Sequence, residues 1–259
     1  MNNILIITIL TVSIFFNGCN NSEPTQISKY TKEANQGNSC AMNSLGMIYK
    51  NGKLTKKDTT KAISWFEKSA QLDNKFAYYN LGRIYYFGDG VKVDFDKARS
   101  NYLKAAELGH DDSLYKLGLM YENSKGIKED INKAIDYYKQ AINLNHKLAM
   151  YSLGDIYDSS ENRDISKIID LYIKSANLGC PDAMYSLGYI YQFGDDGIDA
   201  DLGKAISWYK KSANLNDSNS IYRLGMIYAK NGDQEKAMSM HKKLKPNSNN
   251  AIEILETIK

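Results

Sequence analysis

The chain has 259 residues, and its formal net charge of +3 comes from 33 basic and 30 acidic side chains. Charges of both signs are mixed along the chain without long runs of one sign, so the composition gives no indication of a surface for nucleic acid or for an acidic membrane. Tyrosine is abundant, with 20 copies that all lie at or beyond Tyr30. A repeated pattern accounts for nearly the whole length, and we therefore expect one elongated domain.

The first residues stand apart from this pattern. Residues 4–16 form a 13-residue apolar run, which is too short to span a bilayer and has the length of a signal-peptide core. We predict a signal peptide over residues 1–18 and a polar tether over residues 19–26. Gly18-Cys19 directly after the apolar run resembles the lipobox of bacterial lipoproteins, which implies a lipid on Cys19 and a place on the periplasmic side of a bacterial membrane. The alternative is a plain secretory signal with an incidental cysteine, which would give a soluble periplasmic or secreted protein.

A Leu-Gly pair with a tyrosine at a fixed offset recurs at intervals of 36, 36, 36, 34 and 37 residues. A fixed period of this size indicates stacked supersecondary units, none of which can bury its apolar face alone. We predict an all-α fold, an α/α superhelical solenoid of about six helix-turn-helix repeats with half-repeat caps. The pairs are Leu45-Gly46, Leu81-Gly82, Leu117-Gly118, Leu153-Gly154, Leu187-Gly188 and Leu224-Gly225.

Each unit is predicted to contain two helices. The first has a one-sided stripe such as Ala77, Leu81 and Ile84, and its glycine should let a neighbouring helix approach closely. A loop follows, in which glycine ends the helix and Val or Ile plugs the gap between helices. An aspartate three residues before a lysine then predicts the N-cap of the second helix. These aspartates are Asp58, Asp94, Asp130, Asp164, Asp201 and Asp233.

The pattern Ala-x-x-x-Leu-Gly-x-x-Tyr, a Gly-rich loop, and Lys-Ala-x-x-Trp-Phe-x-Lys-Ser-Ala resembles the Sel-1-like repeat family, a relative of the tetratricopeptide repeats. The fourth unit is the most degenerate, because Ser159-Ser160-Glu161-Asn162 replaces the Gly-rich loop. The array is predicted over residues 27–259, with helical caps at both ends. Its units are expected at about 39–73, 74–109, 110–145, 146–179, 180–216 and 217–246.

No pattern in the sequence predicts a catalytic, cofactor or metal site. His110, His146 and His241 are isolated and are expected on the surface or in loops, while Cys40 and Cys180 are expected to be unpaired and mostly buried. The carboxylates that follow Gly194 lack the spacing of an EF-hand, so an expanded repeat loop is the favoured interpretation.

The resemblance implies a scaffold, since Sel-1-like proteins act mostly as adaptors. We predict no enzyme but an exported, lipid-anchored repeat protein that binds a protein or peptide of unknown identity on its concave face, with no nucleic acid, metal or cofactor. The outward positions two residues after each repeat leucine vary and are the candidate contacts, unless they are simply a solvated surface. They are Met47, Arg83, Leu119, Asp155, Tyr189 and Met226.

The alternative function is a hydrolase or binder of β-lactams or cell-wall material. It is implied by a cysteine-rich exported branch of the same family, whose regularly spaced cysteine pairs this chain lacks. Ser207 and Ser239 each precede a lysine by three residues, as in the Ser-x-x-Lys motif of penicillin-recognising enzymes, but the partner motifs Ser-Asp-Asn and Lys-Thr-Gly do not occur.

Overall fold

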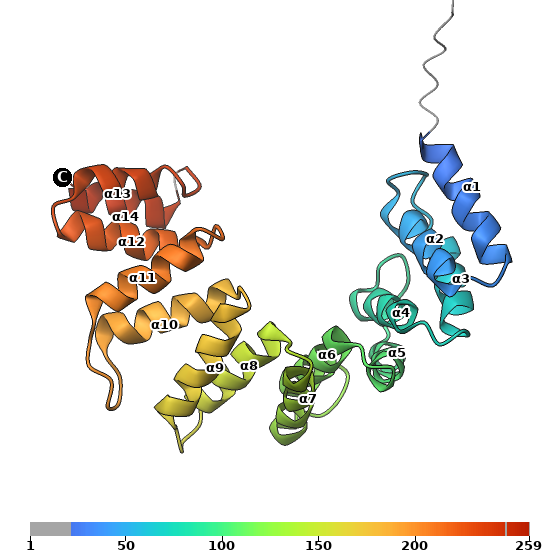
Figure 1. Ribbon diagram of the computed structural model, residues 1–259, viewed down its shortest axis with the longest axis horizontal. Coiled ribbons are helices and arrows are strands. Elements are labelled where there is room, and N and C mark those ends of the chain that lie inside the picture. The colour runs from blue at the N-terminus through green and yellow to red at the C-terminus, as the bar shows by residue number, and fades with distance from the viewer. Residues whose placement is uncertain (1–21, 247, 259) are drawn as a thin grey trace, which may run out of the picture. The chain divides into compact units, whose positions relative to one another are not determined.

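The computed structural model describes residues 22–246 and 248–258, and the regular elements in that part of the chain are all helices. The predicted signal peptide and the predicted lipid attachment at Cys19 lie outside the described residues. The chain divides into two compact units, the first ending at Leu72 and the second beginning at Asp73. The first unit contains α1 (Ser22–Asn35), α2 (Ser39–Asn51) and α3 (Thr59–Ala70), drawn from blue to cyan in Figure 1.

Helix α1 is the predicted N-terminal half repeat. Its Ala34 is buried together with Ala41 and Leu45 of α2, and Tyr30 packs against this cluster. Because α1 begins at Ser22, residues 22–26 of the predicted tether belong to a helix instead of an extended linker. Ser-Glu-Pro is compatible with a first helical turn, where the N–H that proline lacks would have no partner within the helix.

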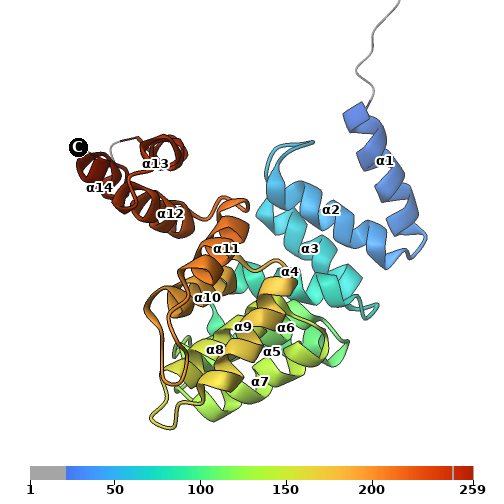
Figure 2. The ribbon, with the colours of Figure 1, turned by 60° about the vertical axis from the view of Figure 1, so that its left-hand side comes forward.

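In the second unit each first helix packs against the second helix of its own repeat, and that second helix packs against the first helix of the next repeat (Figures 1 and 2). Neighbouring hairpins therefore share a continuous interior, as the sequence predicts for a solenoid. The helices are α4 (Lys75–Phe87), α5 (Phe95–Glu107), α6 (Asp111–Glu122), α7 (Ile131–Asn143), α8 (Lys147–Asp158), α9 (Ile165–Asn177), α10 (Pro181–Phe193), α11 (Leu202–Ala213), α12 (Ser218–Lys230), α13 (Gln234–His241) and α14 (Asn249–Ile258).

The predicted aspartate caps are confirmed. Each of the six aspartates accepts a hydrogen bond from the backbone N–H three residues later, as Asp94 does from Lys97 at 2.9 Å and Asp201 from Lys204 at 2.9 Å. The same lysine lies over the ring of a tyrosine in the preceding first helix in several repeats, for example Lys97 at 5.2 Å from the centroid of Tyr85. One short sequence pattern thus caps the start of the second helix and places a contact between its first turn and the first helix.

The glycine of each Leu-Gly pair makes room for a large side chain. A Cβ atom added to Gly118 would lie 2.4 Å from the ring of Tyr138, and one added to Gly154 would lie 2.5 Å from Tyr172. These are distances that real Cβ atoms do not adopt, so the ring occupies the space that the missing side chain leaves. The fully buried tyrosines of the second helices are Tyr102, Tyr138, Tyr172 and Tyr209.

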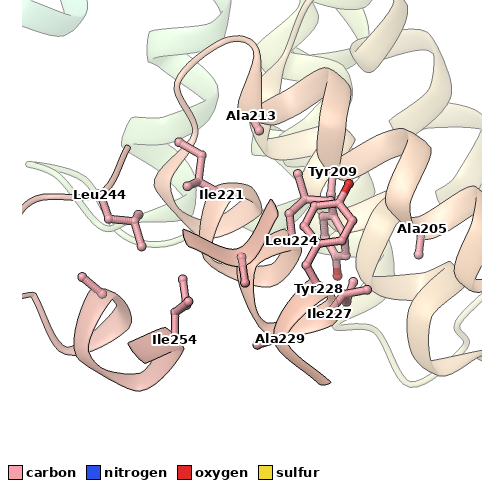
Figure 3. Close-up of a cluster of buried hydrophobic side chains, with 12 residues drawn as sticks. Ala205, Tyr209, Ala213, Ile221, Leu224, Ile227, Tyr228, Ala229, Leu244 and Ile254 are labelled. Atoms are coloured by element: carbon pink, nitrogen blue, oxygen red, sulfur yellow. The ribbon is translucent and has the colours of Figure 1, made fainter. Parts of the chain in front are cut away.

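Helix α14, the last described helix, packs as the first helix of a further repeat would. Ile254 of α14 lies against Gly225 of α12 and is fully buried in the cluster that also contains Leu224 and Leu244 (Figure 3). Helix α14 therefore takes the place that the next repeat would occupy, which agrees with the predicted half-repeat cap. None of the described helices has the length and apolar character that crossing a bilayer requires.

Two of the three histidines lie at loop positions, one of the two predicted places, but they are buried and not on the surface. His110 and His146 are 4% and 7% exposed, and each is the N-cap of a first helix, where its Nδ1 atom accepts the backbone N–H of Ser113 or Ala149. They occupy the positions of Asn38 and Asn74 in the first two repeats. Their burial was not predicted because helical periodicity does not reveal a capping role. A neutral imidazole can accept a hydrogen bond as an asparagine does.

The cysteine prediction is half correct. Both thiols are free, and Cys180 is buried at the N-cap of α10, but Cys40 is exposed. Cys40 lies in the first turn of α2, immediately before the buried Ala41, and so points away from the stripe that packs against α3.

Candidate functional site

The six candidate residues occupy equivalent positions on the first helices but differ in their surroundings. Met47 is half-buried on α2 in the first unit. The other five lie on α4, α6, α8, α10 and α12 of the second unit, and among them only Tyr189 is exposed, at 45%. Their environments decide which of them are able to contact a partner.

Arg83 belongs to a basic patch. Its guanidinium lies 5.8 Å from the ring centroid of Tyr79, one turn earlier on α4. Lys116, on the neighbouring first helix α6, is half-buried, and this burial lowers the pKa of its ammonium, as does the positive charge of Arg83. The carboxylate of Asp112 acts on Lys116 in the opposite direction and raises its pKa. The pair of cations is able to bind a further anionic group from a partner.

Asp155 is half-buried, and its charged neighbours are acidic, unlike those of Arg83. Its carboxylate accepts a hydrogen bond from the Tyr172 hydroxyl at 2.7 Å. Burial raises the pKa of the Asp155 carboxyl, and the negative charges of Asp158 and Asp182 act in the same direction. A carboxylate in this position gains stabilisation from a nearby cation.

Leu119 and Met226 are structural residues in this array. Leu119 packs against the buried cluster that contains Leu153 and Tyr138. Met226 packs against the C-terminal cluster, and its sulfur accepts the Thr257 hydroxyl at 3.7 Å. The structure therefore gives these two positions a packing role that sequence variation alone did not distinguish from an outward one.

Tyr189 is part of an exposed aromatic cluster with an arginine. Its ring centroid lies 4.7 Å from that of Phe193, which is 55% exposed. The Arg223 guanidinium lies over both rings, at 5.3 Å from Tyr189 and 5.6 Å from Phe193. The Nε atom of Arg223 is buried and has no hydrogen-bond partner among the described residues. We call Tyr189, Phe193 and Arg223 the aromatic–arginine cluster.

Phe193 was not among the predicted site residues. It ends α10, two residues after the repeated Tyr191; the second repeat has Phe87 at this offset, and the other repeats have polar residues. An apolar ring one helical turn after Tyr189 was the available signal. Tyrosines two residues before the repeat leucine, by contrast, pack between repeats, since Tyr79 stacks on His110 at 4.5 Å and Tyr115 on His146 at 4.8 Å.

The residues considered for other chemistry lie elsewhere. Ser207 and Lys210 are exposed on α11, and Ser239 is exposed on α13. Asp195, from the loop considered for calcium, forms an ion pair with Arg163 of the preceding loop. Within residues 22–246 and 248–258, no group of three or more His, Cys, Asp or Glu side chains is arranged to hold a metal ion.

The paired helices and the way in which successive pairs pack define an α/α repeat protein. The Sel1 repeat pattern matches residues 41–74, 75–110, 111–146, 147–180 and 181–217. Residues 218–244 match a tetratricopeptide repeat, so the sixth unit departs from the predicted type. Its two helices are joined only by Asn231-Gly232-Asp233, which leaves no room for the longer Sel1 loop. The chain belongs to the Sel1 repeat family.

Solved structures agree with this assignment. A Sel1 repeat protein from Oxalobacter formigenes is 29% identical, with a TM-score of 0.74, over 83% of this chain and 97% of that one. An immunity protein from Pseudomonas aeruginosa has the same fold, with 21% identity and a TM-score of 0.52 over 73% of this chain and 72% of that one. No curated protein has significant sequence similarity to this chain. Sel1 and tetratricopeptide repeats generally mediate protein–protein interactions.

Proposed function

We propose that this protein is a scaffold that binds a segment of another protein on the face of its first helices, the side that the sequence predicts to be concave. The aromatic–arginine cluster is the observation that carries the proposal. Tyr, Phe and Arg are enriched at the centres of protein interfaces, and here two exposed rings are held in place by a guanidinium. The Arg83 and Lys116 patch supports it, because it supplies a second contact of defined charge on the same set of helices.

A selection of displayed random peptides against the purified protein tests this proposal. We expect enriched peptides whose binding weakens at least about ten-fold in a Tyr189→Ala/Phe193→Ala variant, because these rings supply buried apolar area. The matched control is Leu202→Ala/Leu215→Ala, which removes exposed apolar side chains, 43% and 48% exposed, from the second-helix side. Peptides that lose affinity equally in both variants, or only in the control, would show that the binding face is elsewhere.

We further propose that the protein is exported and is anchored by a lipid on Cys19. The supporting observations are the apolar run of residues 4–16 and the small residue before the cysteine. The mass of the mature N-terminus tests this directly. An acylated Cys19 at the N-terminus, lost on Cys19→Ser and on treatment with globomycin, is the expected result. An unmodified N-terminus at another residue would leave only export, and an intact Met1 would refute both.

A further inference from the structure

Two long loops of the array cover the start of a helix in the preceding repeat. Gly126 lies so close to Phe95, at the start of α5, that an added Cβ atom would be 2.1 Å from the Phe95 Cβ atom, and Ile127 packs against the same cluster. Ile198, in the loop between α10 and α11, packs in the same cluster as Ile165 at the start of α9. In both places the loop isoleucine fills the gap between neighbouring repeats.

The loop between α8 and α9 has no such isoleucine. Asp164 follows Tyr157 by seven residues, whereas Asp130 follows Tyr121 by nine, so this loop is two residues shorter. Counted back from the capping aspartate, it carries Ser160-Glu161 where the third repeat carries Gly126-Ile127. As a result Ile131, which begins α7 and corresponds to Phe95 and Ile165, is 36% exposed.

A pocket of about 600 Å³ opens where the loop isoleucine is missing. This volume is within the range of small-molecule and side-chain binding sites. Its apolar wall is formed by Ile131, Ile135, Ile156 and Tyr157, and we call it the α7–α8 pocket. Ser159, Ser160 and Asn162 form the loop side.

The polar groups of the α7–α8 pocket favour a cation. Its two charged lining residues are Glu122, at the end of α6, and Asp155, in the last turn of α8, where the negative end of the helix dipole also attracts positive charge. Tyr138 donates to Glu122 at 2.5 Å, and Tyr172 donates to Asp155 at 2.7 Å, while Asp155 also has a side-chain hydrogen bond with Tyr151. A carboxylate has about four acceptor positions, so both retain capacity for a further donor.

The nearest arginine does not neutralise these carboxylates. Arg163 donates to Asp158, at the end of α8, and to Asp195, in the loop of the next repeat. These ion pairs hold the short loop toward the following repeat and leave the α7–α8 pocket without a basic lining residue. The pocket therefore combines an apolar wall with two carboxylates whose charge is not matched by a lining cation.

We propose that the α7–α8 pocket binds an aliphatic side chain that ends in a cation, an arginine or lysine of the partner segment. The stem would lie against Ile131, Ile135 and Ile156, and the charged end would meet Glu122 and Asp155. Long basic side chains suit this arrangement because they bury their methylene groups while the charged end pairs with carboxylates. The inference rests on the proposed binding of a protein segment and names one anchor of that segment.

The test uses the full mature protein labelled at isoleucine methyl groups and titrated with N-acetyl-arginine amide, N-acetyl-lysine amide and N-acetyl-norleucine amide. We expect the methyl signals of Ile131, Ile135 and Ile156 to shift with the two cationic probes and at least about ten-fold more weakly with the neutral one. The stronger cationic probe identifies which side chain is the anchor. No shift at these three methyls, or equal affinity for norleucine, would overturn the proposal.

Variants separate the pocket from general charge effects. Glu122→Gln/Asp155→Asn is expected to weaken the cationic probes at least about ten-fold, while Glu129→Gln/Asp199→Asn, which removes the same two charges from exposed loops, leaves binding unchanged. Ser159→Leu fills the pocket, keeps both carboxylates and is expected to abolish binding; unchanged binding in either pocket variant contradicts the proposal. The peptide selection tests Tyr189 and Phe193 and does not involve this pocket. If the selection failed while the cationic probes bound the pocket, only the proposed binding face would be refuted.

Discussion

Four tyrosines occupy equivalent buried positions in the second helices but differ in the surroundings of their hydroxyl groups. The hydroxyls of Tyr138, Tyr172 and Tyr209 donate to Glu122, Asp155 and Gln192 near the ends of first helices. The hydroxyl of Tyr102 is buried and has no hydrogen-bond partner among the described residues. Identical rings therefore occupy identical holes, while the polar atom is satisfied in three repeats and not in the fourth.

Phenylalanine substitutions measure this difference. Tyr138→Phe removes a hydrogen bond to a carboxylate and is expected to lower the free energy of unfolding by about 1–2 kcal/mol. Tyr102→Phe removes only an unpartnered hydroxyl, so we expect a change within about 0.5 kcal/mol or a small gain in stability. Urea unfolding of the two variants makes the comparison, and an equal loss in both would contradict the assigned hydrogen bonding.

His110 makes one helix cap sensitive to pH. Burial lowers the pKa of its imidazole below the ordinary 6.5, although Asp112 and Asp111 oppose this, while Lys75 and His146 act in the same direction as burial. The ring also stacks on Tyr79. The folded protein therefore keeps His110 neutral, as its role as acceptor requires, whereas the unfolded chain binds a proton near pH 6.5.

Because the unfolded state binds more protons in this interval, stability should fall as the pH decreases through about 6.5 toward the lower folded pKa. His110→Asn keeps the cap, as Asn38 and Asn74 do in their repeats, and removes this titration. We expect the variant to lose less of its urea midpoint than the parent protein between about pH 7 and pH 5.5. A larger loss in the variant would contradict the neutral state of His110.

At the scale of elements, hairpin geometry depends on the close approach of an aromatic ring to the first helix. Gly118→Ala places a Cβ atom about where the ring of Tyr138 lies, and we expect a net destabilisation of about 1–3 kcal/mol despite the better helix propensity of alanine. Gly203, in the first turn of α11, faces only the Asp201 carboxylate at 3.3 Å, so Gly203→Ala is expected to stay within about 0.5 kcal/mol. Thermal or urea unfolding distinguishes the two, and equal effects would argue against the packing role of the repeat glycine.

Loops, more than helices, distinguish the repeats from one another. The helices repeat because the Leu-Gly pair and the Asp cap recur, whereas the connecting loops vary from three residues after α12 to the longer loops that carry Ile127 and Ile198. A shortened loop leaves the repeated core in place but exposes the start of the preceding second helix. Ile131 and Leu202, at 36% and 43% exposure, precede the two short loops and show this relation.

For the whole molecule, the period of the sequence was enough to predict the fold. Leucine, glycine and tyrosine recur at fixed offsets because neighbouring hairpins of the second unit pack against one another in the same way. The structure confirms the helix pairs and shows half-repeat helices in α1 and α14. The first residue of α1 and the type of the sixth repeat were not predictable in this way, because neither depends on the repeated core.

The candidate face was predicted less well. Position within the repeat placed Arg83 and Tyr189 on an accessible face, but it also selected Leu119 and Met226, which pack inward. Whether an outward position is free depends on side chains from the next repeat, and one helical stripe does not contain that information. The α7–α8 pocket was visible in the sequence only as the replaced loop at Ser159 and Ser160; its apolar wall and its carboxylates come from three different helices.

The central claim is that the face of the first helices contacts a partner protein, and site-specific photo-crosslinking in the cells that produce the protein tests it most directly. A photoreactive phenylalanine replaces Tyr189, which is 45% exposed on α10, and in a matched chain it replaces Lys139, exposed on the second helix α7. We predict a discrete crosslinked partner from position 189 that is absent from position 139. Crosslinks from position 139 alone, or an identical set from both positions, would contradict the account.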